Sequence, residues 1–214
     1  MSKKTELIKV FKDYKEKYEA VQAKKIEIDK SELYTPEGRE EVISKLLDNF
    51  GPIVQQDHDE AVKIIDQGLA ALATVWKNSS AGKLTDSGYQ AGLSNVIKAL
   101  ELGAIREKDD IQNIIDMYSG DFNALAMIKK ILKNSNDEAV VSYASMVPED
   151  KRDRNKQLLN QLKCNVDTYM SINTLKTASR AWNSFNRGLT GVSASMDSMA
   201  EFVETKLGDD LKLL

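Results

Sequence analysis

Few side chains in this sequence could do chemistry, and the densest group of them surrounds His58. This is the only histidine, and it lies between Asp57 and Asp59, with Glu60 following. Such a group could hold a metal ion or respond to pH. However, consecutive helical side chains point in different directions, and the residue one turn after His58 is Val62. We therefore predict acidic residues near a helix start here, not a metal site.

Two pairs of adjacent carboxylates and one cysteine complete the reactive side chains. The pairs Asp109–Asp110 and Glu40–Glu41 could share a proton if they were buried, but both fall in predicted first turns, where the helix dipole favours acids. Cys164 has no histidine near it in the sequence, and no second cysteine exists for a disulfide. No glycine-rich phosphate-binding motif occurs. We predict no catalytic residue, cofactor or metal, and a protein that is not an enzyme.

The composition predicts that the side chains through which this protein makes contacts are carried by helices. Of the 214 residues, 42% are hydrophobic and 29% are charged, which is typical of a chain with a core. Only 11 glycines and 3 prolines are present, too few to punctuate a fold of many short strands, and no run alternates at period two. We predict an all-α, elongated fold with long amphipathic helices at both ends and a compact bundle of short helices in the middle. The expected segments are 1–82, 83–147 and 148–214.

Membrane insertion is not expected from the hydropathy pattern. The longest uncharged runs, 67–76 and 87–97, hold ten and eleven residues, whereas a membrane span needs about 18 apolar residues. The unpaired cysteine suits a reducing cytoplasm.

The first predicted helix runs from about Lys4 to Asp29 and carries apolar residues at the heptad spacing of a coiled-coil seam. The next seam position is Lys25, so the strict seam is too short for a stable free-standing coil, and we expect this helix to pack on another element. Its apolar face is one candidate surface for binding a partner. The residues are Leu7, Phe11, Tyr14 and Tyr18.

The next elements are marked by helix-end signals. Thr35-Pro36 predicts a helix start, Gly51-Pro52 predicts a helix end or a kink, and residues 78–82 (Asn-Ser-Ser-Ala-Gly) predict a loop. Four short helices follow between Leu84 and Val147. Their expected N-caps include Asp86, Asp121 and Asn136 or Asp137.

The last third combines a basic helix with a methionine-containing one. Residues 151–190 hold eight basic and two acidic side chains, a net charge of +6, within a helix predicted from Pro148 to about Asn186. Its basic side chains could bind nucleic-acid phosphates or an acidic protein surface. A final helix, 192–207, offers side chains that either fill the core or meet a partner. The candidate partner-binding residues are Lys151, Arg152, Arg154, Lys156, Met196, Met199 and Phe202.

The segment IDKSELYTPEGREE, residues 28–41, joins a charged helix to a second amphipathic one. It resembles small structural proteins of tailed bacteriophages from Gram-positive hosts, including head, scaffold-like and other assembly proteins. The resemblance implies a virion component, assembled in the host cytoplasm, that contacts many copies of capsid, tail or connector proteins and possesses no catalytic residues. A homo-oligomer is also compatible with it. The alternative is a cytoplasmic helical adaptor, or a nucleic-acid-associated protein that uses the basic helix 151–187.

Overall fold

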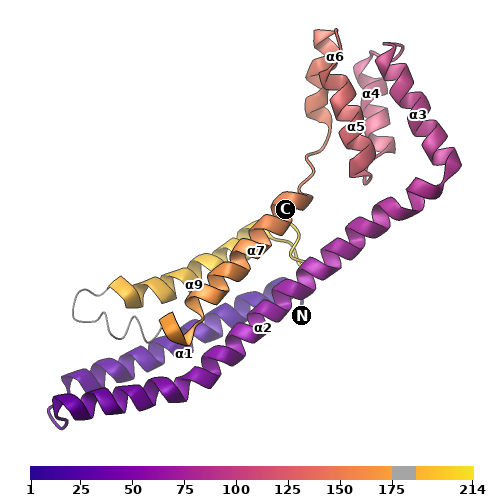
Figure 1. The fold of residues 1–214 in the computed structure, drawn as a ribbon. Coiled ribbons are helices and arrows are strands. Elements are labelled where there is room, and N and C mark those ends of the chain that lie inside the picture. The colour runs from indigo at the N-terminus through magenta and orange to yellow at the C-terminus, as the bar shows by residue number, and fades with distance from the viewer. Residues whose placement is uncertain (175–186) are drawn as a thin grey trace. The chain divides into compact units, whose positions relative to one another are not determined.

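A computed structural model describes residues 1–174 and 187–214 (Figure 1). Within these ranges the chain forms helices and no strand, and Leu207 and Leu213 make one isolated β-bridge, so the prediction of an all-α fold is confirmed. The helices are α1 (Lys3–Lys30), α2 (Pro36–Thr85), α3 (Ser87–Glu101), α4 (Lys108–Met117), α5 (Phe122–Lys133), α6 (Glu138–Tyr143), the 3₁₀ turn η1 (Ala144–Met146), α7 (Arg152–Tyr169) and α9 (Arg187–Lys206).

The chain divides into two compact units, which differ in extent from the three segments expected from the sequence. Unit 1 contains Met1–Leu72 and Asp153–Leu214, whereas unit 2 contains Ala73–Arg152. The two ends of the chain therefore fold together, and the middle of the chain forms a unit of its own.

In unit 1, α1 packs along α9 and against the first part of α2. The Tyr14 ring stacks on Phe50 of α2, with 6.4 Å between ring centroids. Lys15 pairs with Asp197 of α9 at 2.7 Å. The backbone N–H of Lys4 also donates to the carbonyl of Asp209 at 3.4 Å, so α1 and α9 run antiparallel. The predicted packing of the heptad face is thus found inside unit 1.

Helix α2 is longer than the sequence predicts. Thr35 accepts a hydrogen bond from the N–H of Gly38 at 3.2 Å, which confirms the helix start. The helix then continues through Pro52 and through the predicted loop 78–82. Proline removes one backbone hydrogen bond, but the burial of Phe50 and Val54 on either side holds the helix together. At 78–82 each weak helix former costs only about 1 kcal/mol or less, so no residue there forces a break.

Helix α7 is shorter than predicted, since it ends at Tyr169 and not near Asn186. The Ser171 hydroxyl accepts the N–H of Asn173 at 3.3 Å, and the Thr174 hydroxyl donates to the carbonyl of Thr168. These local side-chain bonds compete with the helical backbone pattern and stop the helix. Residues 175–186 of the predicted rod lie outside the described residues. The final helix starts at Arg187, before the predicted residue 192.

The segment after α9 contributes Leu211 to the core of unit 1. Leu211 is fully buried at a φ of +63°. A Cβ atom at Gly68 of α2 would lie 2.8 Å from the Leu211 Cδ1 atom, so a larger residue there would require the Leu211 side chain to shift. The buried side chain of Asn155 on α7 donates to the Leu211 carbonyl at 3.1 Å and accepts the Leu213 N–H at 3.2 Å.

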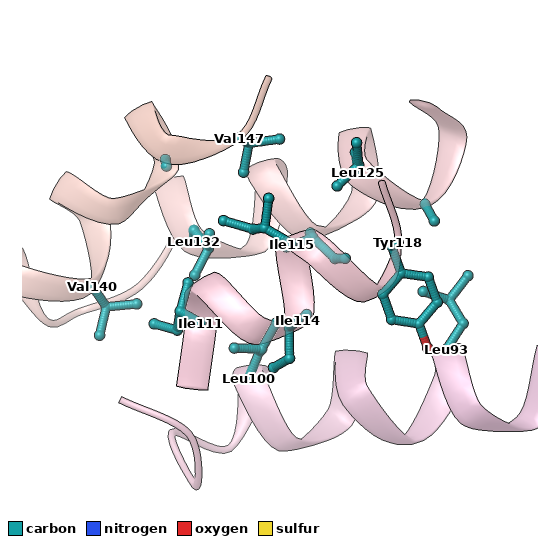
Figure 2. Packing of buried hydrophobic residues seen from close by; sticks show 13 residues of the cluster. Leu93, Leu100, Ile111, Ile114, Ile115, Tyr118, Leu125, Leu132, Val140 and Val147 are labelled. Carbon is teal, nitrogen blue, oxygen red and sulfur yellow. The ribbon is translucent and has the colours of Figure 1, made fainter. Parts of the chain in front are cut away.

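Unit 2 is a bundle of the short helices, whose capping was largely predicted. Asp86, Asp121 and Asp137 cap α3, α5 and α6, and Gly103 follows α3 at a φ of +65°. Figure 2 shows apolar side chains from α3, α4, α5 and residues 140–147 pointing toward one another. Asp121 also accepts a 2.7 Å hydrogen bond from the hydroxyl of Tyr89, whose ring contacts Tyr118 edge-on. Unit 2 therefore has its own hydrophobic core.

Candidate functional site

The apolar partner-binding candidates of α1, and one of the three on α9, are core residues of unit 1. Each has an exposed fraction of 1% or less, so the folded chain does not offer these side chains to a partner. The heptad spacing reflects packing of α1 within the same chain, which periodicity by itself does not distinguish from packing between chains. The residues are Leu7, Phe11, Tyr14, Tyr18 and Met196.

Two of the predicted residues line a groove of about 550 Å³ between α7 and α9. Met199 is 4% exposed and belongs to its floor, whereas Phe202 is half-buried. Among the described residues, those that line the groove carry no charge, and they combine apolar side chains with amides and hydroxyls. They are Leu158, Gln161, Leu162, Asn165, Tyr169, Gly191, Ala194, Ser195, Ser198, Met199 and Phe202.

The groove forms because α7 has a second, half-buried apolar face beside its core face, and because α9 has small residues opposite it. On α7, Leu159 and Val166 are buried in the core, while Leu158 and Tyr169 lie on a neighbouring face that is only half-buried. On α9 the facing positions are small: Ala194, Ser195 and Ser198 do not fill the space opposite α7. An uncharged hollow between two helices is the surface that an apolar segment of another protein fits. The sequence did not indicate this hollow.

The four basic candidates are divided between the two units and differ in their contacts. Arg152, in unit 2, pairs with Asp150 at 2.6 Å, and its guanidinium lies 5.2 Å from the centre of the Phe122 ring. Lys151 is half-buried in the same unit, whereas Arg154 and Lys156, in unit 1, are exposed. Arg154 lies one turn before Leu158, on the groove face of α7. Arg152 thus stabilises its own unit.

His58 contacts α7 from its position on α2. Its Nε2 lies 2.9 Å from Asp167 of α7, and its Nδ1 lies 3.0 Å from Asp59. Eight residues further along α2, Asp66 pairs with Lys163 of α7 at 2.8 Å. Within the described residues, no group of three or more histidine, cysteine, aspartate or glutamate side chains could hold a metal ion. The two pairs hold α7, one wall of the groove, against α2.

We expect His58 to make unit 1 more stable at acidic than at neutral pH. Burial lowers the pKa of His58, but hydrogen bonds to Asp59 and Asp167 raise it by more, so that the pKa exceeds its usual value near 6.5. The added stability is therefore complete below pH 6.5 and is lost as the pH rises through the pKa of the folded state. Because His58 is the only histidine, its NMR titration is unambiguous.

The measurement compares urea unfolding of the wild type and of His58→Gln at pH 5.5 and pH 8. The wild type should gain up to about 1 kcal/mol at the lower pH relative to the variant, since a partly exposed ion pair contributes no more. Asp137→Asn, a change at the half-buried N-cap of α6 in unit 2, is the control. A His58 pKa below 6.5 would contradict the prediction.

The remaining carboxylate pairs and the cysteine lie on the surface. Both carboxylates of Asp109–Asp110 and of Glu40–Glu41 are exposed, and so is Cys164. Unit 2 also contains a hollow of about 700 Å³ at the ends of α3 and α5, where Arg106 donates to the carbonyl of Gly103 at 2.7 Å. This bond closes the turn after α3. The position of the Arg106 side chain in the hollow therefore has a structural reason that needs no ligand.

Comparison with known proteins adds no functional assignment. No family model, no curated protein and no solved structure matches this chain. Among the described residues, no helix is sufficiently long and apolar to span a membrane.

Proposed function

We propose that this protein is a non-enzymatic structural protein of a phage virion or of its assembly, and that it acts through protein–protein contacts. The observation that carries this proposal is the uncharged groove between α7 and α9. Open apolar grooves on proteins of this size serve contact with other proteins or with ligands. The resemblance of residues 28–41 to phage structural proteins supports the virion and the host cytoplasm as its locations.

The alternative, a nucleic-acid-associated protein that uses the basic stretch, has less support. Two of its basic side chains, Arg152 and Lys163, are paired with carboxylates of the same unit at 2.6 and 2.8 Å. Phosphate binding needs cations that are free to replace counterions. The exposed Arg154 and Lys156 are two residues apart on one helix and so point in different directions.

The test is whether the groove is needed for the protein to enter phage particles. A Ser198→Trp variant fills the groove from an exposed position, so it should leave the fold intact while reducing the amount in gradient-purified particles by roughly tenfold, as for loss of a central contact. Ser94→Trp, at an exposed position of α3, is the matched control. Immunoblotting of the particles measures the outcome.

The proposal would be wrong if the wild-type protein were absent both from particles and from their assembly intermediates. It would also be wrong if a phage that does not make this protein gave an unchanged yield of particles.

A further inference from the structure

The loop between α1 and α2 presents an exposed apolar pair at the end of a helical hairpin. Leu33 is 90% exposed and Tyr34 is 39% exposed. An exposed leucine alone is ordinary, but this loop is braced on both sides. Ser31 accepts the N–H of Leu33 at 3.3 Å, and Arg39 donates to the Ser31 carbonyl at 2.7 Å. The apolar pair is therefore held outward in a fixed geometry, which lowers the entropic cost of docking it.

Acidic side chains surround this tip, which we define as residues 31–37. Glu32 and Glu37 are both exposed and flank the apolar pair. Further along α2, Glu40 and Glu41 are also exposed. A surface that receives the tip should therefore combine an uncharged apolar hollow with basic side chains at its edge.

The groove of unit 1 has this combination at one end. Asn155 of α7 bonds to Leu211 and Leu213, so the start of α7 lies beside the end of α9 and the two helices are antiparallel. Arg154 lies one turn before Leu158, and Lys206 lies one turn after Phe202, each exposed and on the groove face of its helix. Both walls thus carry a basic residue at the same end of the groove.

The tip does not reach the groove of its own chain. The contacts Lys4–Asp209 and Lys15–Asp197 set α1 alongside α9 so that the groove residues 191–202 lie level with about residues 10–22 of α1. The eight residue-to-residue steps from Gln22 to Lys30 place the loop roughly 12 Å further along, at 1.5 Å per step. Because the loop is braced and α1 is continuous, a groove that holds this tip must belong to another molecule.

We propose that Leu33 and Tyr34 of one copy dock into the α7–α9 groove of a second copy, with Glu32 and Glu37 facing Arg154 and Lys206. This inference rests on the proposed function in taking the groove as a contact surface. The contact joins two different patches of the same chain, so it is heterologous. Repeated, it yields a ring or an open filament and not a two-fold dimer. Such growth suits a protein that is present in many copies.

The decisive experiment uses two full-length variants that each lose one side of the contact. Leu33→Ser removes the exposed leucine of the tip, and Ser198→Trp fills the groove. The wild type should associate with a dissociation constant on the order of 100 µM or lower in analytical ultracentrifugation, whereas each variant should be monomeric at the same concentration. Mixed together, the variants should form a capped one-to-one dimer, because one intact tip and one intact groove remain.

Control variants distinguish loss of this contact from loss of folding and from nonspecific hydrophobic association. Leu102→Ser removes a leucine that is 82% exposed in unit 2 and should leave association unchanged. Arg154→Glu should weaken association at least threefold, and adding Glu32→Lys should restore part of it. Far-UV circular dichroism and thermal melts check that every variant keeps its fold.

Three outcomes would overturn the inference: a wild type that stays monomeric at about 1 mM, a Leu33→Ser variant that associates normally, or variants that fail to complement in the mixture. These outcomes are distinguishable from failure of the proposed function. If self-association is absent but Ser198→Trp still keeps the protein out of phage particles, the groove receives a different protein, and only this inference falls.

Discussion

A Leu211→Ala substitution is expected to destabilise unit 1 by about 2–5 kcal/mol, the range for removing a fully buried leucine side chain. Leu211 lies in the eight residues that follow α9 (207–214), yet it is fully buried and contacts Gly68 of α2. Its backbone is held by the buried Asn155 of α7. Loss of the side chain leaves a cavity where the chain end, α2 and α7 meet, and a braced backbone cannot collapse to fill it.

Hydrogen exchange is the measurement that assigns this loss to the correct unit. In the Leu211→Ala variant, the amides of α1 in unit 1 should exchange faster, by the factor that corresponds to the decrease in the free energy of unfolding of that unit. The amides of α5 in unit 2 should keep their wild-type rates. Leu214→Ala is the matched control, because that leucine is 69% exposed and its truncation should change the stability by less than about 0.5 kcal/mol. Unchanged exchange in α1 would show that the chain end is not part of the core.

The second large effect is expected at Asp121 in unit 2, where substitution by alanine should cost about 2–4 kcal/mol. The carboxylate caps α5 through the N–H groups of Asn123 and Ala124, at 3.1 and 3.2 Å, and accepts the Tyr89 hydroxyl at 2.7 Å. A cap contributes about 0.5–2 kcal/mol, and a hydrogen bond to a charged group about 1.5–3 kcal/mol. Alanine also leaves the hydroxyl of Tyr89 without this acceptor.

A double-mutant cycle with Tyr89→Phe separates the two roles of Asp121. In the Tyr89→Phe background, Asp121→Ala should cost only the loss of the cap, about 1 kcal/mol. Asp137→Ala, which removes the half-buried N-cap of α6 and no buried contact, is the control for that value. Equal costs of Asp121→Ala in both backgrounds would contradict the coupling.

The same site has a predictable pH dependence. Burial raises the pKa of Asp121, but the Tyr89 hydroxyl and two backbone N–H groups lower it by more, so that the pKa falls below its usual value of 3.8. The stabilisation is therefore complete above the unfolded-state pKa, near pH 4, and disappears as the pH falls through the lowered pKa of the folded protein. The Asp121→Ala variant should lack the part of the acid-induced loss of stability that comes from protonation of Asp121, as measured by unfolding at a series of pH values below 4.

The parts of the fold that the sequence predicts well are those fixed by local interactions. Thr35, Asp86 and Asp121 were expected as N-caps and are found in that role, because a cap depends on residues within one turn. The all-α class follows from the periodicity of apolar residues and the absence of alternating runs. Such features need no knowledge of which elements meet.

The features that the sequence does not predict depend on distant partners. The burial of Leu211 depends on Gly68, more than 140 residues away, and no local pattern marks either residue. The groove needs two helices to face each other with small residues on one side, as at Ser195 and Ser198. Among the predicted partner-binding residues, Phe202 and Met199 line that groove, whereas Tyr14 has the same periodic spacing and is core.

The discontinuous makeup of unit 1 has a consequence for synthesis on the ribosome. Residues 1–72 are synthesised before unit 2, whereas α9 and residues 207–214, which cover them, are synthesised after it. At typical translation rates this delay is on the order of 10 s, during which α1 exposes Phe11, Tyr14 and their neighbours. A chain that stops before α9 is made does not bury them and remains open to aggregation and proteolysis.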